Sequence, residues 1–104
     1  MSRGPDAATR LERALIRAAA AAGIDAAVIA ADSTRWASAT FTGARHQLRL
    51  SAPHSGALDA WLAGLSEHEF NLRTHLVADL IVIGTRRVSD AMEIEIEVLT
   101  VEER

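Results

Sequence analysis

The sequence predicts one α+β domain in which two helices cover one face of a four- or five-stranded, mainly antiparallel sheet. Two helical patterns alternate with pairs of strand-like runs along 104 residues, the length of one domain. Hydrophobic residues make up 49% and charged residues 24% of the chain, close to the globular average. This composition excludes disordered and fibrous chains. We expect residues 1–104 to form one domain, with residues 1–8 as a disordered N-terminal tail.

The first helix is predicted from a capping pattern followed by apolar residues. Thr9 and Glu12 have the T-x-x-E spacing of a capping box. Gly23 then supplies a natural helix stop. Small residues dominate the expected buried face, so the helix can approach a sheet closely. The residues that recur at helical spacing are Leu11, Leu15, Ala18, Ala19 and Ala22.

Two or three strands are expected after this helix. The run Ile24 to Ala31 forms either a short strand or an extension of the helix connection, because alanine is a poor strand former. A turn signal at residues 32–34 precedes a strand from Trp36 to Phe41, and Thr42 and Gly43 supply a second turn. The next strand has clear period-two alternation. His46, Leu48 and Leu50 alternate there with Arg45, Gln47 and Arg49.

A second helix and a second pair of strands complete the chain. Pro53 closes the preceding strand and Ser55 can cap a helix that carries Leu58, Trp61, Leu62 and Leu65 on one face. Strands are expected from Leu72 to Ile83 and from Met92 to Val101, joined through residues 84–90. Leu99 and Val101 break the alternation of the last strand, which predicts either a bulge or a change of sheet neighbour near Val98. Its two rows are Met92, Ile94, Ile96 and Val98, and Glu93, Glu95 and Glu97.

The resulting order, α-β-β-α-β-β, is a circular permutation of the ferredoxin-like plan. That plan places the last strand centrally, beside the strand from Ala44 to Ser51. The arginine row at Arg45 and Arg49 then faces the glutamate row of the last strand. The alternative is αβββαββ, if Ile24 to Ala31 forms a full strand. That order resembles secretion-chaperone-like domains, but the chain has no residue motif of that family.

Several chemistries lack their usual residues. The net charge is −3, so neither nucleic acid nor an anionic membrane is an expected partner. The absence of cysteine excludes disulfides, thiolate metal sites and a cysteine nucleophile. G-x-S-x-G, G-x-G-x-x-G and P-loop motifs are also missing. We therefore expect no cofactor and no metal, lean against an enzyme, and expect a cytoplasmic protein because the N-terminus is polar.

The histidines supply the candidate ligand site. His75 and Asp79 lie four residues apart, which on a regular strand places both on one face about 13 Å apart. They would be polar groups on an apolar strand, and together with Arg73 they form the candidate binding set. The alternative is that both lie near a sheet edge or pair with neighbours. His46 is expected to be a core or interface histidine, and His54 and His68 lie too far apart to share a metal.

The candidate interface consists of Trp36, Arg45 and Arg49. Trp36 lies either on the exposed face of the sheet, where a lone aromatic often marks an interface, or on the buried face. The favoured function is a small non-enzymatic interaction or adaptor module that forms homodimers through its sheet or an edge strand, with another protein as a further partner. The alternative is a small-ligand-binding protein or minor enzyme with a pocket near His75 and Asp79.

Overall fold

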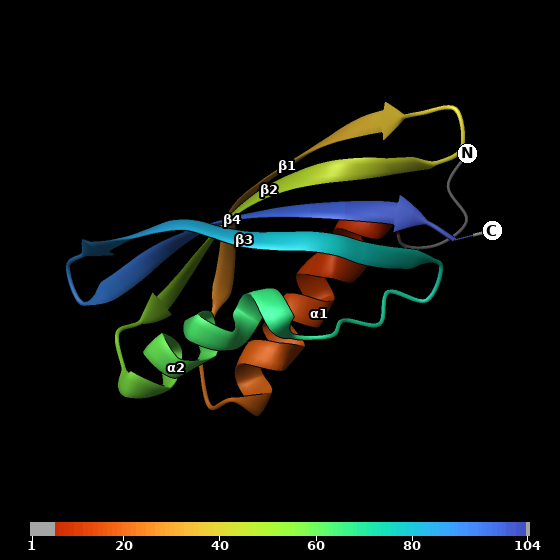
Figure 1. Cartoon of the computed structure of the whole chain (residues 1–104). Coiled ribbons are helices and arrows are strands. Elements are labelled where there is room, and N and C mark those ends of the chain that lie inside the picture. Colours follow the sequence, from red (N-terminus) through yellow and green to blue (C-terminus); the bar gives the residue numbers. More distant parts are fainter. Residues whose placement is uncertain (1–5, 104) are drawn as a thin grey trace.

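The computed structural model, which describes residues 6–103, confirms the predicted α+β class and the order α-β-β-α-β-β. Figure 1 shows the four strands side by side with both helices on one side of the sheet. The strands pair in the order β1-β2-β4-β3, antiparallel throughout, so the last strand is central as the permuted plan requires. The elements are α1 (Ala7–Ala21), β1 (Ala27–Ala37), β2 (Thr42–Pro53), α2 (Gly56–Gly64), β3 (His75–Val88) and β4 (Ala91–Glu102).

β1 is one continuous strand, so the alternative order αβββαββ is wrong. The turn expected at residues 32–34 is strand instead, because Asp32, Ser33 and Thr34 pair in register with Gln47, His46 and Arg45 of β2. This ladder of backbone hydrogen bonds outweighs the local turn preference. The chain turns later, where the Ser38 N–H donates to the Phe41 carbonyl at 2.8 Å. Thr42 and Gly43 therefore belong to β2 rather than to the turn.

The helix caps agree with the sequence in one case only. Ser55 caps α2 as predicted, its Oγ accepting a hydrogen bond from the Leu58 N–H at 3.1 Å. In α1 the cap is Asp6 rather than Thr9: Asp6 Oδ1 accepts from the Thr9 N–H at 2.9 Å. A carboxylate at this position also opposes the positive end of the helix dipole. The predicted disordered tail therefore does not extend to Ala7 and Ala8, and residues 1–5 lie outside the described residues.

The β3–β4 hairpin is longer and tighter than predicted. β3 continues through the expected connection to Val88, and the chain reverses at Ser89, which has a φ of 55°. The bulges lie in β3, between Val77 and Asp79 and between Val82 and Gly84. β4 keeps unbroken register with β2, so the bulge or change of sheet neighbour predicted near Val98 is wrong.

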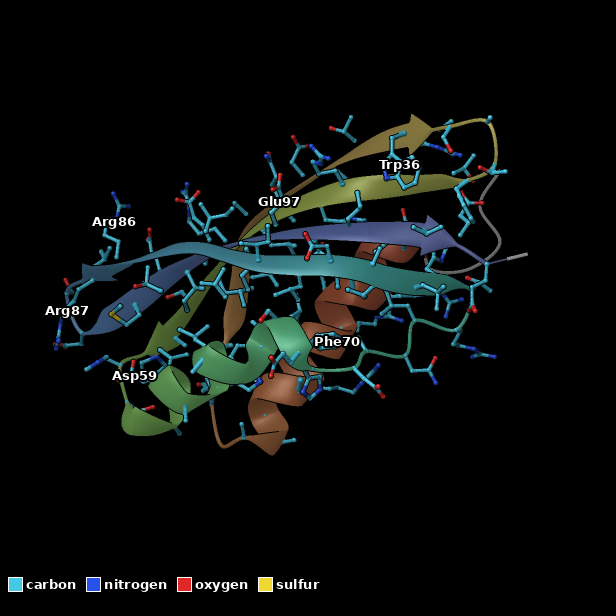
Figure 2. All side chains as sticks on the ribbon, in the orientation of Figure 1. Trp36, Asp59, Phe70, Arg86, Arg87 and Glu97 are labelled. Atoms are coloured by element: carbon cyan, nitrogen blue, oxygen red, sulfur yellow. The ribbon has the colours of Figure 1, made fainter. Side chains whose placement is uncertain are left out.

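The core lies between the helices and the inner face of the sheet. Leu11, Leu15 and Ala19 of α1 pack there, together with Leu58 of α2 and Leu65 of the 3₁₀ turn that follows α2. The sheet contributes Leu48, Leu50, Ile94, Ile96 and Val98, all at most 4% exposed. Figure 2 shows Trp36, Arg86 and Glu97 on the side of the sheet away from the helices, and Phe70 on the helix side. No helix within residues 6–103 is long and apolar enough to cross a membrane.

Candidate functional site

Complementary charges line the uncovered face of the sheet, as the sequence predicts. Arg45 is diagonal to Glu97, with Nε and Oε2 3.9 Å apart, and Arg49 is directly opposite Glu95, with Nη2 and Oε2 3.7 Å apart. Arg86 of β3 adds a pair with Glu93 at 2.9 Å between Nη2 and Oε1. A row of arginines on β2 therefore runs beside a row of glutamates on β4, and the two rows neutralise each other within the chain.

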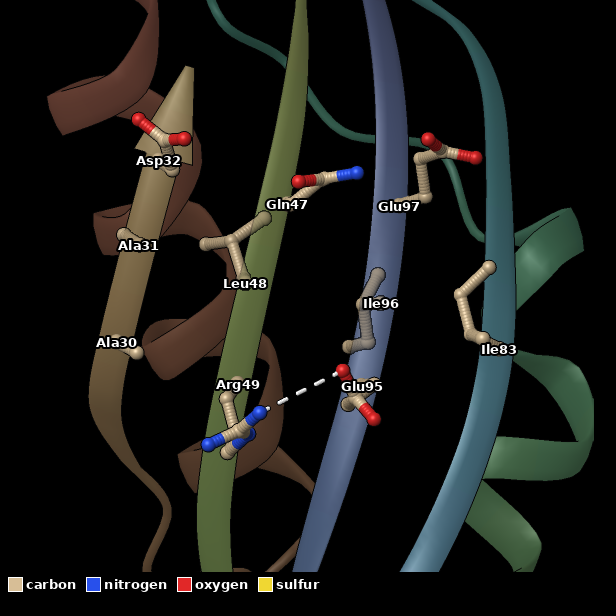
Figure 3. A pocket seen from close by; sticks show the side chains of 10 residues that line it. All are labelled: Ala30, Ala31, Asp32, Gln47, Leu48, Arg49, Ile83, Glu95, Ile96 and Glu97. Atoms are coloured by element: carbon tan, nitrogen blue, oxygen red, sulfur yellow. Dashed lines mark ion pairs between the residues drawn. The ribbon is translucent and has the colours of Figure 1, made fainter.

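A shallow hollow of about 360 Å³ lies in the centre of this uncovered face. Figure 3 shows the Arg49–Glu95 pair on its floor, with Ala30 and Ala31 along β1 and Ile83 on β3 at the opposite rim. Ala30, which pairs with Arg49 on the uncovered face, has a side chain too short to fill the space above β1. The uncovered face is therefore recessed along β1, which we call its low side, and raised along β3, which we call its high side.

The high side carries three large apolar side chains, and Asp79 lies between Leu76 and Ile81 on the same side of β3. Leu76, Ile81 and Ile83 of β3 are 53%, 46% and 59% exposed, and we call these three residues the β3 apolar strip. Leu76 pairs with Val101 of β4, and Ile81 pairs with Glu97. Ile83 is the extra residue of the second β3 bulge, which turns it toward the hollow. Exposed clusters of large apolar side chains often mark interaction surfaces.

Trp36 lies on the uncovered face, the first of its two predicted alternatives, but it is half-buried. It pairs across β1 and β2 with Gly43, and a Cβ added at Gly43 would lie 2.8 Å from the Trp36 ring. The indole therefore occupies the space that glycine leaves open. Its Nε1 is buried and has no hydrogen-bond partner among the described residues. Trp36 therefore packs against Gly43 of its own chain and does not project into solvent.

The predicted set Arg73, His75 and Asp79 does not converge on one site. The bulge after Val77 changes the phase of β3, so His75 pairs with Glu102 on the helix side while Asp79 pairs with Leu99 on the uncovered side. The expectation that His75 and Asp79 share a face is therefore wrong. Arg73 lies in the loop before β3 with a φ of 68°, where its N–H donates to Asn71 Oδ1 at 2.9 Å.

His75 instead lines a polar hollow of about 530 Å³ on the helix side of the sheet, at the end where α1 begins. The hollow opens where α1 starts and the apolar core ends. Charged groups of both signs surround it, including the Arg35–Glu102 pair with Nη2 and Oε2 3.7 Å apart. Its other lining residues include Asp6, Ala7, Ala8, Ser33, Ala44, His46 and Thr74.

His46 forms the inner wall of this polar hollow and is 2% exposed, as expected of a core histidine. Its Nδ1 lies 2.7 Å from Ser33 Oγ, and its Nε2 lies 2.9 Å from Thr100 Oγ1. Thr100 donates its hydroxyl proton to the Ala44 carbonyl at 3.3 Å. Because that hydroxyl has one proton, Nε2 of the neutral ring must donate to Thr100 and Nδ1 must accept from Ser33.

Burial lowers the pKa of His46 below its usual 6.5, and the charge of His75 lowers it further, while the Asp6 carboxylate acts in the opposite direction. The ring is therefore neutral at pH 7, in agreement with the hydrogen-bond pattern. A neutral imidazole with a free lone pair on Nδ1 is a base. The Ser33 hydroxyl is the group placed to use it.

Sequence reasoning missed Ser33 and Thr100. Ser33 lies in the segment taken for a turn, and Thr100 follows the position of the expected bulge. Thr100 could have been found from the apolar row of β4. Without a bulge, this row of alternate residues continues from Val98 to Thr100. A polar residue at a core position indicates a buried partner, which is His46.

Neither a metal-binding cluster among the described residues nor a similar protein indicates what these two surfaces bind. Within residues 6–103, no group of three or more histidine, aspartate or glutamate side chains is placed to hold a metal ion. No protein-family model, curated protein or solved structure matches the chain. The uncovered face and the polar hollow are therefore the two candidate functional surfaces.

Proposed function

We propose that the protein is an interaction module that forms a homodimer by packing the uncovered sheet face against a second copy. The observation that carries this proposal is the β3 apolar strip, with each side chain about half exposed on a face that no described helix covers. Burying such side chains is favourable by about 25 cal/mol per Å² of apolar surface. A small domain gains proportionally more from this burial than a large one.

Charge complementarity favours a second copy as the occupant. A two-fold axis parallel to the strands and between β2 and β4 exchanges the two sides of the face. It places the arginine row of each copy over the glutamate row of the other. The same rotation brings the β3 apolar strip over the partner's β1, where the short side chain of Ala30 leaves room for Ile83. The uncovered face is thus self-complementary in both charge and shape.

Mass measurement of the untagged protein tests this proposal. We expect a dimer at about 10 µM by light scattering and native mass spectrometry. Ile83→Arg should raise the dissociation constant at least about 10-fold, because it places a charge in the apolar contact. Phe41→Arg is the matched control: Phe41 is 55% exposed but lies in the β1–β2 turn, so this variant should remain dimeric.

Two results would contradict the dimer. One is a wild-type chain that stays monomeric at about 100 µM. The other is equal dissociation by Phe41→Arg and Ile83→Arg, which would mean that any added charge weakens association. A heteromeric complex with a monomeric isolated chain would replace the second copy by another protein.

A second candidate function is small-ligand binding in the polar hollow, favoured by its volume of about 530 Å³ beside His75. Ligand pockets commonly measure roughly 300–1,000 Å³. Arg35 and Glu102 contribute the charged groups here, in place of Arg73 and Asp79. We expect a small metabolite to shift the ring signals of His75 in NMR spectra, and His75→Ala to weaken binding. A metabolite screen that leaves those signals unchanged would rule this candidate out.

A further inference from the structure

We propose that Ser33 is a nucleophile activated by His46, and that the polar hollow binds small carboxylic esters whose acyl group Ser33 accepts. This inference rests on the second candidate function, because the ester would occupy the polar hollow. It is independent of the proposed dimer, which uses the opposite face of the sheet.

The orientation of the hydrogen bonds carries the inference. Thr100 donates to the Ala44 carbonyl and accepts from His46 Nε2, so the lone pair of Nδ1 points to the Ser33 hydroxyl, 2.7 Å away. A nucleophile, a base and a group that orients the base therefore lie in one chain of contacts across β1, β2 and β4. Ser33 is exposed on the edge strand, whereas His46 is buried. The hydroxyl is thus accessible from the hollow, and its base lies buried directly behind it.

The same hollow offers donors to a developing oxyanion. Arg35 lines it, and its guanidinium is exposed enough to leave Glu102 for a substrate. Ala7 and Ala8 of the first turn of α1 also line it, and N–H groups at that end of a helix have no acceptor within the helix. Hydrogen-bond donors of this kind stabilise the tetrahedral intermediate of acyl transfer.

The proposed reaction has two steps, acylation of Ser33 and hydrolysis of the acyl-serine. Ser33 Oγ bonds to the ester carbonyl carbon as its proton moves to His46 Nδ1, and the carbon–oxygen bond to the alcohol breaks as that proton passes to the departing oxygen. Water then adds to the acyl carbon as one of its protons moves to His46 Nδ1. The bond between that carbon and Ser33 Oγ breaks, the proton returns to Oγ, and the carboxylic acid leaves. The orienting partner is a neutral threonine instead of a carboxylate, so the imidazolium is less stabilised than in a triad. We therefore expect esters of acidic alcohols to react rather than amides.

Labelling with diisopropyl fluorophosphate tests Ser33 directly. The serine oxygen forms a bond to phosphorus, the phosphorus–fluorine bond breaks, and fluoride leaves with the proton. We expect one adduct, located on Ser33 by peptide mass spectrometry, absent from Ser33→Ala and retained in Ser38→Ala. Thr100→Val should slow labelling at least about 10-fold in protein that remains folded by circular dichroism, because Thr100 positions the base.

A cysteine scan measures the action of His46 without any ester. The chain has no cysteine, so Ser33→Cys and Ser38→Cys each introduce a single thiol. An adjacent imidazole favours the thiolate. Iodoacetamide at about pH 6 should therefore alkylate Ser33→Cys at least about 10-fold faster than Ser38→Cys. Adding Thr100→Val to Ser33→Cys should reduce that advantage.

Failure to label Ser33 with diisopropyl fluorophosphate would overturn the inference, as would equal alkylation of the two thiols. Neither result would affect the ligand-binding candidate, which depends on metabolite-induced shifts of His75. A protein that shows those shifts but leaves Ser33 unlabelled binds a ligand without acyl transfer. A protein that shows neither has no site in the hollow.

Discussion

The two faces of the β2 and β4 strands differ sharply, although both are formed by alternate residues of the same two strands. The inner row, including Leu50 and Ile94 at 0% exposure, is packed beneath the helices. The outer row pairs Arg49 with Glu95, whose side chains are 44% and 60% exposed. Burial of a large apolar side chain contributes about 1.5–3 kcal/mol, whereas an exposed ion pair contributes roughly 0.2–1 kcal/mol. Folding stability therefore depends on the inner face, and the outer face is available for recognition.

Truncation of the inner face should have the largest effect. Leu50→Ala should lower the free energy of unfolding by about 2–5 kcal/mol, because the buried side chain leaves a cavity among its neighbours. Ile83→Ala on the outer face should cost less than about 1 kcal/mol in the monomer. Urea unfolding at low protein concentration, where the chain is monomeric, compares the two variants. Equal costs would show that both faces contribute alike to folding.

Gly43→Ala should cost about 1–3 kcal/mol although it adds one methyl group to the outer face. The new Cβ would overlap the Thr100 carbonyl oxygen of β4 and displace the Trp36 ring, and backbone cannot move aside cheaply. Ala substitution at Gly64, which has open space around its Cβ position, is the control. Thermal unfolding measures stability, and tryptophan fluorescence reports the Trp36 environment when Trp61, the second tryptophan, is replaced by phenylalanine in both proteins. An unchanged melting temperature for Gly43→Ala would contradict the close packing of Trp36.

Acidification should test the polar part of the inner face. The pKa of His46 in the folded state is below 6.5, so between that pKa and 6.5 the unfolded chain binds more protons than the folded protein. The contribution of neutral His46 is therefore complete above about pH 6.5 and is lost as the pH falls through the lowered pKa. The pKa of Asp6 lies below 3.8, so its contribution is lost at more acidic pH.

Urea unfolding between about pH 8 and pH 5 measures this dependence. Replacement of His46 by glutamine should flatten the curve, since glutamine keeps polar groups in place without titrating. His68→Gln, in the loop after α2, should follow the wild type. A wild-type curve as flat as that of His46→Gln would contradict a neutral buried ring.

The smallest effect is expected on the outer face. Arg49→Ala should change the free energy of unfolding by roughly 0.2–1 kcal/mol, because water and salt screen its pair with Glu95. A double-mutant cycle with Glu95→Ala, at low and high salt, isolates the pair. A coupling that persists at high salt would indicate that the outer face is covered, as it would be in the proposed dimer.

Local patterns in the sequence determined much of this molecule. The alternation in β2 and β4 predicts two central strands, and Ser55 predicts the start of α2. The facing rows of arginine and glutamate follow from the element order, as the Arg45–Glu97 and Arg49–Glu95 pairs confirm. The alternation and the cap depend on residues two to four positions apart, so a window of sequence contains them, whereas the facing rows also require the order of the elements.

Tertiary structure decided the rest, because strand pairing joins residues far apart in the chain. The ladder with β2 carries β1 straight through a turn signal, and the bulge after Val77 separates His75 from Asp79. Neither a ladder nor a bulge has a local pattern, since each depends on how two strands align. The same alignment brings Ser33, His46 and Thr100 together from three strands. Periodicity assigns a side chain to a face, but only the register of neighbouring strands determines which side chains meet there.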